Sequence, residues 1–146
     1  MDDNRGFSLL ELLIVVAIIL IIATIAIPSL LRSRQAAQES SAVAQVRTIN
    51  TAEVTYLSSN QGSYGQMPEL ITQGFLDNRF SGAVSGYVFV VTASGTDYTV
   101  TATPTSTNAG RYGYYSTPDA VIRYQGAVTT TCNPCFPTGA SLAPVN

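Results

Sequence analysis

Residues 12–27 read LLIVVAIILIIATIAI, and this run decides how the rest of the chain is interpreted. It holds no charged side chain, and Thr24 is its one polar residue. With the following Pro28 to Leu31 it reaches about 20 residues, the length that an α-helix needs to cross a bilayer core of roughly 30 Å. Strands rarely run this long, so we predict a membrane-spanning helix. Pro28 lacks a backbone donor, and we expect a helix kink or a loosened turn there.

A cleavable secretory signal peptide is the first alternative, because it also has a charged start followed by an apolar run. Its apolar region is shorter and ends in small residues, whereas Pro-Ser-Leu-Leu-Arg follows here. We therefore expect the segment to be retained. Positive charge at Arg5 is opposed by Arg32 and Arg34 at the far end, so the positive-inside rule points weakly against a carboxy-terminal part outside the cytoplasm.

Glu11 breaks the apolar pattern at the start of this segment. A charged residue at the centre of a membrane helix costs roughly 2.5 to 3.5 kcal/mol on insertion scales, and less near the interface. Two interpretations are open. Glu11 either reaches the headgroup region, or it neutralises a cation supplied by another copy of the chain.

The composition limits the classes of function. The chain has 146 residues, a formal net charge of -2, no lysine and no histidine. No basic surface for nucleic acid is expected, and the commonest general base and metal ligand is missing. After Asn60 the sequence is rich in Thr, Ser, Gly, Tyr and Val, which is typical of secreted β-rich domains. We expect a small extracytoplasmic head.

The run Gly6 to Ile18, GFSLLELLIVVAI, closely resembles the amino-terminal segment of type IV prepilins and the related pseudopilins. The resemblance implies cleavage between Gly6 and Phe7, N-methylation of Phe7, and roles for Glu11 in subunit assembly and Pro28 in loosening the helix. The leader MDDNRG is less basic than most prepilin leaders, and leucine stands at position 20 where many relatives have glycine.

Cleavage at this position would create an α-ammonium group at Phe7 in the same apolar zone as Glu11. Two such charges on neighbouring helices can offset each other, where each alone would be costly. Because buried ion pairs often add little net stability, we expect the pair of Phe7 and Glu11 to set the axial register between subunits.

The helical spacing continues after Leu31 to about Leu57. One side carries an apolar stripe that should pack against the head, formed by Ala42, Val46, Ile49, Tyr56 and Leu57. Glu53 falls within this stripe, and we expect it at the rim; a buried ion pair is the alternative.

The remaining segments predict an α+β fold. Met67 to Gly74 reads as a short helix, and Tyr87 to Thr92 and Tyr98 to Thr103 as a β-hairpin. Tyr112 to Tyr115 and Ala120 to Tyr124 are candidate further strands. The predicted architecture is a long N-terminal membrane-spanning helix packed on a small antiparallel β-meander, the ladle of the pilin family.

We interpret the strand tyrosines as cross-strand packing pairs rather than as a conducting or sugar-binding surface. Asp97 and Asp119 are turn residues rather than calcium ligands, so no metal and no cofactor is predicted. For Cys132 and Cys135, a zinc half-site and a thioredoxin-type motif lack their usual context. In an oxidising compartment a local disulfide is favoured over free thiols.

These observations predict a structural filament subunit and not an enzyme. The domains are a leader at 1–6, a long helix at 7–57 with its transmembrane part at 7–31, a connection with a short helix at 58–82, and a β head with the Cys loop at 83–146. The resemblance implies adhesion, motility or DNA uptake-type roles. A type II secretion pseudopilin is one alternative, disfavoured because no acidic residue follows Asp119. A non-polymerising membrane-anchored binding domain is the other, ahead of an anchored hydrolase or redox enzyme.

The resemblance also implies partners and a location. The partners are other copies of the chain in a helical homopolymer, a prepilin peptidase and methylase, the pilus assembly machinery of the membrane, and the lipid bilayer before assembly. The precursor would lie in the bacterial inner membrane as a single-pass protein, and the mature subunit in an extracellular surface filament.

Overall fold

The computed structural model describes residues 8–126 and 143–145. It divides into two compact units between Ser33 and Arg34, and each unit is considered by itself. The helix α1, Leu9–Ser59, contributes to both units. Its assignment runs through Pro28 without a break.

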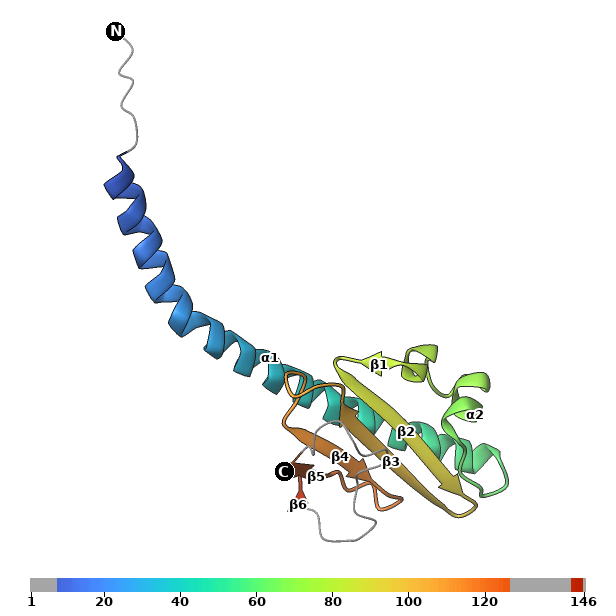
Figure 1. Ribbon diagram of the computed structural model, residues 1–146. Coiled ribbons are helices and arrows are strands. Elements are labelled where there is room, and N and C mark those ends of the chain that lie inside the picture. The colour runs from blue at the N-terminus through green and yellow to red at the C-terminus, as the bar shows by residue number, and fades with distance from the viewer. Residues whose placement is uncertain (1–7, 127–142, 146) are drawn as a thin grey trace. The chain divides into compact units, whose positions relative to one another are not determined.

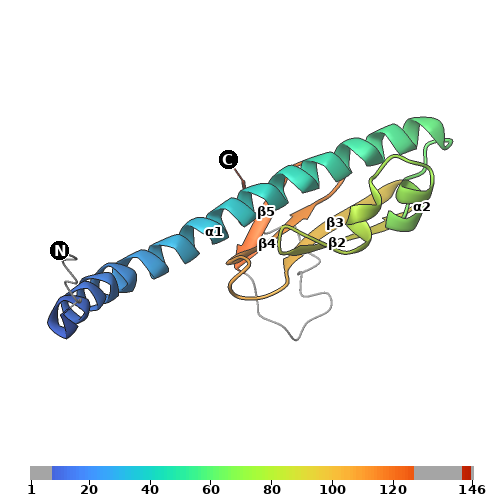
Figure 2. The ribbon, with the colours of Figure 1, turned by 90° about the horizontal axis from the view of Figure 1, so that it is seen from above.

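The second unit continues with the short helix α2 (Met67–Thr72) and the 3-10 helix η1 (Asn78–Ser81). Six strands follow in one antiparallel sheet, and their spatial order equals their order in the chain, so the sheet is a meander. Figure 1 shows these elements, and Figure 2 shows the part of α1 after Arg34 along one face of the sheet. The strands are β1 (Ala83–Val84), β2 (Tyr87–Ser94), β3 (Asp97–Pro104), β4 (Tyr112–Ser116), β5 (Arg123–Gly126) and β6 (Ala143–Pro144).

The core lies between α1 and this sheet. The predicted helical stripe is buried at Ala42, Val46, Ile49 and Tyr56, and Leu57 is half-buried. On the sheet, alternate residues of β2 and β3 face the same core, namely Tyr87, Phe89, Val91, Tyr98, Val100 and Ala102. The apolar residues that recur every 3.6 positions in the helix therefore pack against those that recur every second position in the strands. The predicted α+β fold, with a long helix packed on an antiparallel meander, is confirmed.

The predicted hairpin is also confirmed and is tighter than expected. Pairing extends to Ser94 and Asp97, so only Gly95 and Thr96 form the turn. Further along, the strand expected from Ala120 begins at Arg123 instead, because Ala120 has a left-handed backbone conformation with φ of 57°. The short helix begins at Met67 as predicted and ends at Thr72.

Tyrosines of the sheet pack on one another as the sequence predicts. The rings of Tyr87 and Tyr114 lie 5.9 Å apart between centroids, and those of Tyr112 and Tyr124 lie 5.3 Å apart. The distances are in the range of favourable aromatic pairs.

A buried polar cluster joins α1 to the sheet. Asn50 donates from Nδ2 to Ser116 Oγ at 2.8 Å and accepts from the Tyr98 hydroxyl at 3.1 Å. Nearer the start of the head, Glu39 accepts the backbone N–H of Arg111 at 2.7 Å and pairs with its guanidinium at 3.2 Å. These bonds fix the helix on the sheet at two separate levels.

The expectation for Glu53 was wrong. Its side chain is fully buried, rather than at the rim, and it forms no ion pair with any residue that the structure describes. The reason is the chain after α1, which returns over the helix end and places the backbone N–H of Gly65 3.1 Å from Glu53 Oε2.

Candidate functional site: the amino-terminal apolar segment

The first part of α1 exposes apolar side chains almost without interruption. Leu9 is 80 % exposed, Leu20 60 % and Ile27 65 %. This is the one helix in the described part of the chain that is long and apolar enough to cross a membrane, by length and composition. Exposed apolar surface on this scale marks a site of contact with lipid or with other protein.

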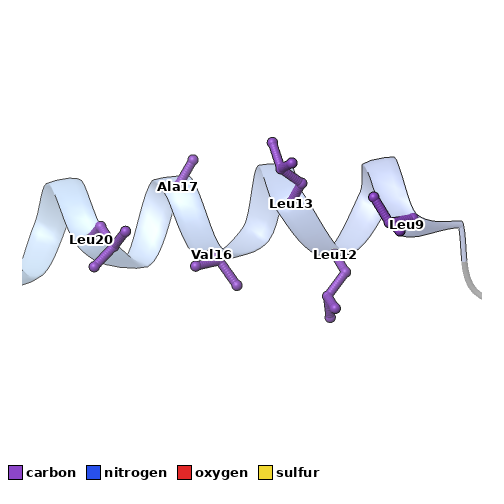
Figure 3. A pocket seen from close by; sticks show the side chains of 6 residues that line it. All are labelled: Leu9, Leu12, Leu13, Val16, Ala17 and Leu20. Atoms are coloured by element: carbon purple, nitrogen blue, oxygen red, sulfur yellow. The ribbon is translucent and has the colours of Figure 1, made fainter.

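One face of this segment is hollowed into a shallow apolar groove. In Figure 3, Leu13 and Ala17 lie on one side, Leu12 and Val16 on the other, and Leu9 and Leu20 close the ends. The spacing follows successive helical turns, so the six side chains form one continuous stripe. We call this set the apolar stripe. The sequence pattern does not distinguish this stripe from the other faces of the helix, since every face of this segment is apolar.

Glu11 is exposed in the first turn of α1. At 100° per residue, it lies on the opposite side of the helix from the apolar stripe. A neighbour that covers the stripe therefore cannot also cover Glu11 unless it wraps around the helix. The two features point to contacts on at least two sides of the segment.

The polar groups of the segment differ in whether the helix itself supplies their hydrogen-bond or charge partners. The Thr24 hydroxyl donates to the Ile21 carbonyl at 2.7 Å, which satisfies it within the helix. Pro28 has no N–H to offer the carbonyl four residues earlier, which is that of Thr24. The carboxyl group of Glu11 is the ionisable group in this segment, and in an apolar environment it would need either a proton or a cationic partner.

The structure describes only part of the predicted site. Glu11 and Pro28 both lie in α1. Gly6, Phe7, Cys132 and Cys135 lie outside the described residues. Within 8–126 and 143–145, no group of three or more His, Cys, Asp or Glu side chains is placed to hold a metal ion.

Asp119 has a structural partner in the head. It accepts hydrogen bonds from the Thr117 hydroxyl and the Val121 N–H, and forms an ion pair with Arg123 at 2.5 Å. The Arg123 hydrogen bond is the largest cause that lowers the pKa of Asp119 to about 2. It therefore fixes a turn, as predicted.

A long exposed apolar helix that continues into a helix packed on an antiparallel meander defines a class: membrane-anchored subunits with a small α+β head. The family described as Prokaryotic N-terminal methylation motif matches residues 1–27. Over 134 residues the chain is 28 % identical to the type IV wide pilus major component PilA4 of Thermus thermophilus, which covers 92 % of this chain and 97 % of that protein.

A second relative matches a shorter region. The chain is 44 % identical over 55 residues to the type IV major pilin protein PilA of Myxococcus xanthus, which covers 38 % of this chain and 25 % of that protein. The amino-terminal motif, the fold and these two relatives make the chain similar to type IV pilins.

Proposed function

We propose that this chain is a structural subunit of a type IV pilus-like surface filament, assembled through the amino-terminal part of α1. The observation that carries the proposal is that no residue of the described apolar segment is buried within the chain. Its surface needs lipid before assembly, and other copies of the same helix afterwards. The relatives support this, since both are named as major components or major pilins of type IV pili.

The proposed life cycle begins with a single-pass precursor in the bacterial inner membrane. A prepilin peptidase would remove residues 1–6 by cutting between Gly6 and Phe7, and a methylase activity would modify the new amino group of Phe7. The match of residues 1–27 to the N-terminal methylation motif supports this step. The pilus assembly machinery would then move the subunit into an extracellular filament with adhesion, motility or DNA uptake-type roles.

The geometry of the segment suggests how copies meet. The apolar stripe offers a seam for one neighbouring helix, and Glu11 faces the opposite side, where a second neighbour can bring its Phe7 ammonium. Each helix would therefore contact at least two others. That arrangement suits a helical polymer better than a closed dimer, because the contacts are heterologous.

Pro28 has a proposed role in the same assembly. Pro28 would act as the point where the helix bends or loosens, since the Thr24 carbonyl lacks its usual backbone donor there. Apolar helices on either side supply the packing, so a local loss of one hydrogen bond is tolerable.

The first test is to shear filaments from cells and determine the intact mass and the terminal sequence of their principal protein. We expect this chain, beginning at Phe7 and methylated there. Filaments made of another protein, with this chain left in the membrane, would favour a non-polymerising anchored domain. Filament subunits that still carried MDDNRG would contradict the processing step.

The disulfide between Cys132 and Cys135 is a separate proposal. It rests on maturation outside the reducing cytoplasm, where closely spaced cysteines are commonly oxidised. Intact mass of filament protein after thiol labelling, with and without reductant, measures it. We expect both thiols to react only after reduction; labelling of both in unreduced filaments would contradict the bond.

A further inference from the structure

Glu53 is an ionisable group in the head that filament assembly through the amino-terminal segment does not use. It lies in α1, two turns before the helix ends at Ser59, and its side chain is fully buried. The chain after the helix packs over it. This returning segment, Tyr64 to Gln66, is called the clasp below.

The clasp is bonded on three sides. Towards α2, the Gln66 N–H donates to Glu69 Oε2 at 2.8 Å. Towards α1, the Gly65 N–H donates to Glu53 Oε2 at 3.1 Å. Towards the β2–β3 hairpin, the Tyr64 N–H donates to the Gly95 carbonyl at 2.9 Å, and Gln66 Nε2 donates to the Ala93 carbonyl at 2.8 Å. Glu53 therefore holds the clasp from the helix side, while the hairpin holds it from the sheet side.

The packing around this contact is close. A side chain at position 65 would meet the ring of Tyr56 at 2.9 Å, so glycine is needed for the clasp to approach the helix. The other carboxyl oxygen of Glu53, Oε1, is buried and has no hydrogen-bond partner among the described residues. A carboxylate there would carry its charge with a single hydrogen bond, which is costly in a buried site.

The groups that face Glu53 do not supply a cation. Among the described residues, the ionisable groups whose charge interacts with Glu53 are Glu69 from α2 and Tyr98 from β3. Tyr64 from the clasp packs on Tyr98, and the Tyr56 ring of α1 lies next to Gly65. Burial raises the pKa of Tyr98, and Tyr64 and Glu53 raise it further, so its hydroxyl stays neutral around physiological pH.

We propose that Glu53 is a pH-sensitive latch: its neutral form holds the clasp against α1, and its ionised form weakens the clasp. Loss of the proton leaves the Glu53 carboxylate negatively charged, with its Oε1 buried and without a hydrogen-bond partner among the described residues. The carboxylate of Glu69 repels this charge. Opening the clasp lets water reach that charge. The hairpin carbonyls of Gly95 and Ala93 then lose their partners as well.

The titration of Glu53 sets the pH range. Burial raises its pKa from 4.5 to about 7, the Gly65 N–H lowers it in part, and Glu69 raises it further. Between these two values the closed state binds a proton that the open state releases, so closure is favoured as the pH falls and is weakened as the pH rises through about 7. The proposal concerns the head alone and does not depend on filament assembly.

Hydrogen exchange of the full chain in detergent micelles measures the latch. Protection factors, corrected for the intrinsic exchange rate, would be compared at about pH 5.5 and about pH 8.5, on either side of the titration. We expect the amides of Tyr64 and Gly65 to lose protection by about tenfold or more at the higher pH, while Val91 and Val100 in the sheet keep theirs. Unchanged clasp protection, or an equal loss throughout the sheet, would overturn the proposal.

Matched variants separate the latch from general effects of charge. Glu53→Gln keeps an acceptor for Gly65 and cannot ionise, so its clasp should be protected equally at both pH values. Glu39→Gln removes a different buried carboxylate and should keep the wild-type pH dependence. A Glu53→Gln variant with the wild-type pH dependence would show that another group titrates.

A direct titration of the wild-type chain covers the case in which the variant does not fold. Carbon-13 labelling of the glutamate carboxyl groups gives signals from Glu11, Glu39, Glu53 and Glu69. We expect one signal, assigned to Glu53, to titrate near neutral pH. If the Glu53 signal titrates near its ordinary acidic value, the latch is ruled out.

Discussion

The two parts of α1, residues 9–33 and 34–59, differ in whether the chain itself covers their apolar side chains. In the first part, Leu20 is 60 % exposed, whereas Ile49 in the second part is 0 % exposed. Both are large aliphatic residues in one helix, so intrinsic helix propensity does not explain the difference. The second part finds its partner in the sheet of its own chain. The first part needs a partner from outside, which is why we propose it as the site of assembly.

The glutamates of α1 show the same contrast for charge. Glu11 stands exposed in an apolar segment, Glu39 is paired with Arg111, and Glu53 is buried with one hydrogen bond. A carboxylate with an internal partner stabilises the head. A carboxylate without an internal cationic partner requires either a proton, as proposed for Glu53, or a cation from another subunit, as proposed for Glu11.

The largest expected effect comes from Glu11→Ala. The variant should accumulate in the membrane with a folded head, because removing a carboxylate makes the segment more apolar. Assembly should fail, since the Phe7 ammonium of a neighbour is left without its counter-charge at a cost of roughly 3 to 5 kcal/mol per contact. The measurement compares sheared filament yield with the amount of subunit in the membrane fraction.

Glu11→Gln is the near-isosteric control for this prediction. It keeps the size and the hydrogen-bonding capacity of the side chain and loses only the charge, so it should also assemble poorly. Normal filament yield from both variants would show that Glu11 is a bystander at the membrane interface and that another feature sets the register.

Asn50→Ala tests the second part of α1 and should give the opposite result. It leaves the buried Tyr98 hydroxyl and Ser116 hydroxyl without their partner, which costs about 2 to 3 kcal/mol of unfolding free energy in the head. Membrane insertion should be normal, because the apolar segment is unchanged. Denaturant unfolding of the full chain in detergent, followed by tyrosine fluorescence, measures the loss.

The neighbouring Thr51→Ala serves as the control for Asn50→Ala. Thr51 is exposed, and its hydroxyl only donates back to the Arg47 carbonyl at 3.0 Å. We expect a change within about 0.5 kcal/mol. An equal loss of stability in both variants would mean that the cluster around Asn50 is not what fixes the helix to the sheet.

Periodicity explains which parts of the fold were predictable from sequence. The stripe at Ala42, Val46 and Ile49 stands out against polar neighbours, and so do the alternating strands β2 and β3. The apolar stripe between Leu9 and Leu20 could not be found in this way, because all faces there are apolar and no contrast remains. Glu11 was recognised from the sequence as a departure from that uniform background and as part of the prepilin-like segment.

Long-range contacts explain what was missed. The burial of Glu53 depends on Gly65, which returns over the helix only after the turn that follows α1. No local pattern reports such a contact. The short strand β6 pairs with β5 across a separation that spacing alone does not reveal, and a two-residue strand has no period to detect.

The smallest expected effect is a gain of stability from Ala120→Gly, in the turn between β4 and β5. Ala120 has φ of 57°, where an L residue with a side chain is strained by about 1 kcal/mol and glycine is not. Its N–H donates to the Thr117 carbonyl at 2.8 Å, and Asp119 holds the residues on either side, so the turn enforces this conformation.

Glycine also gains freedom in the unfolded chain, which offsets part of the relief, and we expect a net gain of about 0.5 kcal/mol in unfolding free energy. Ala44→Gly is the matched control, because Ala44 is exposed in regular helix, where the same change should cost about 1 kcal/mol. Opposite signs for the two variants in the same unfolding measurement would support the assigned backbone at Ala120. Filament yield from Ala120→Gly should equal that of the wild type, because a more stable head leaves the exposed surface of the apolar segment unchanged.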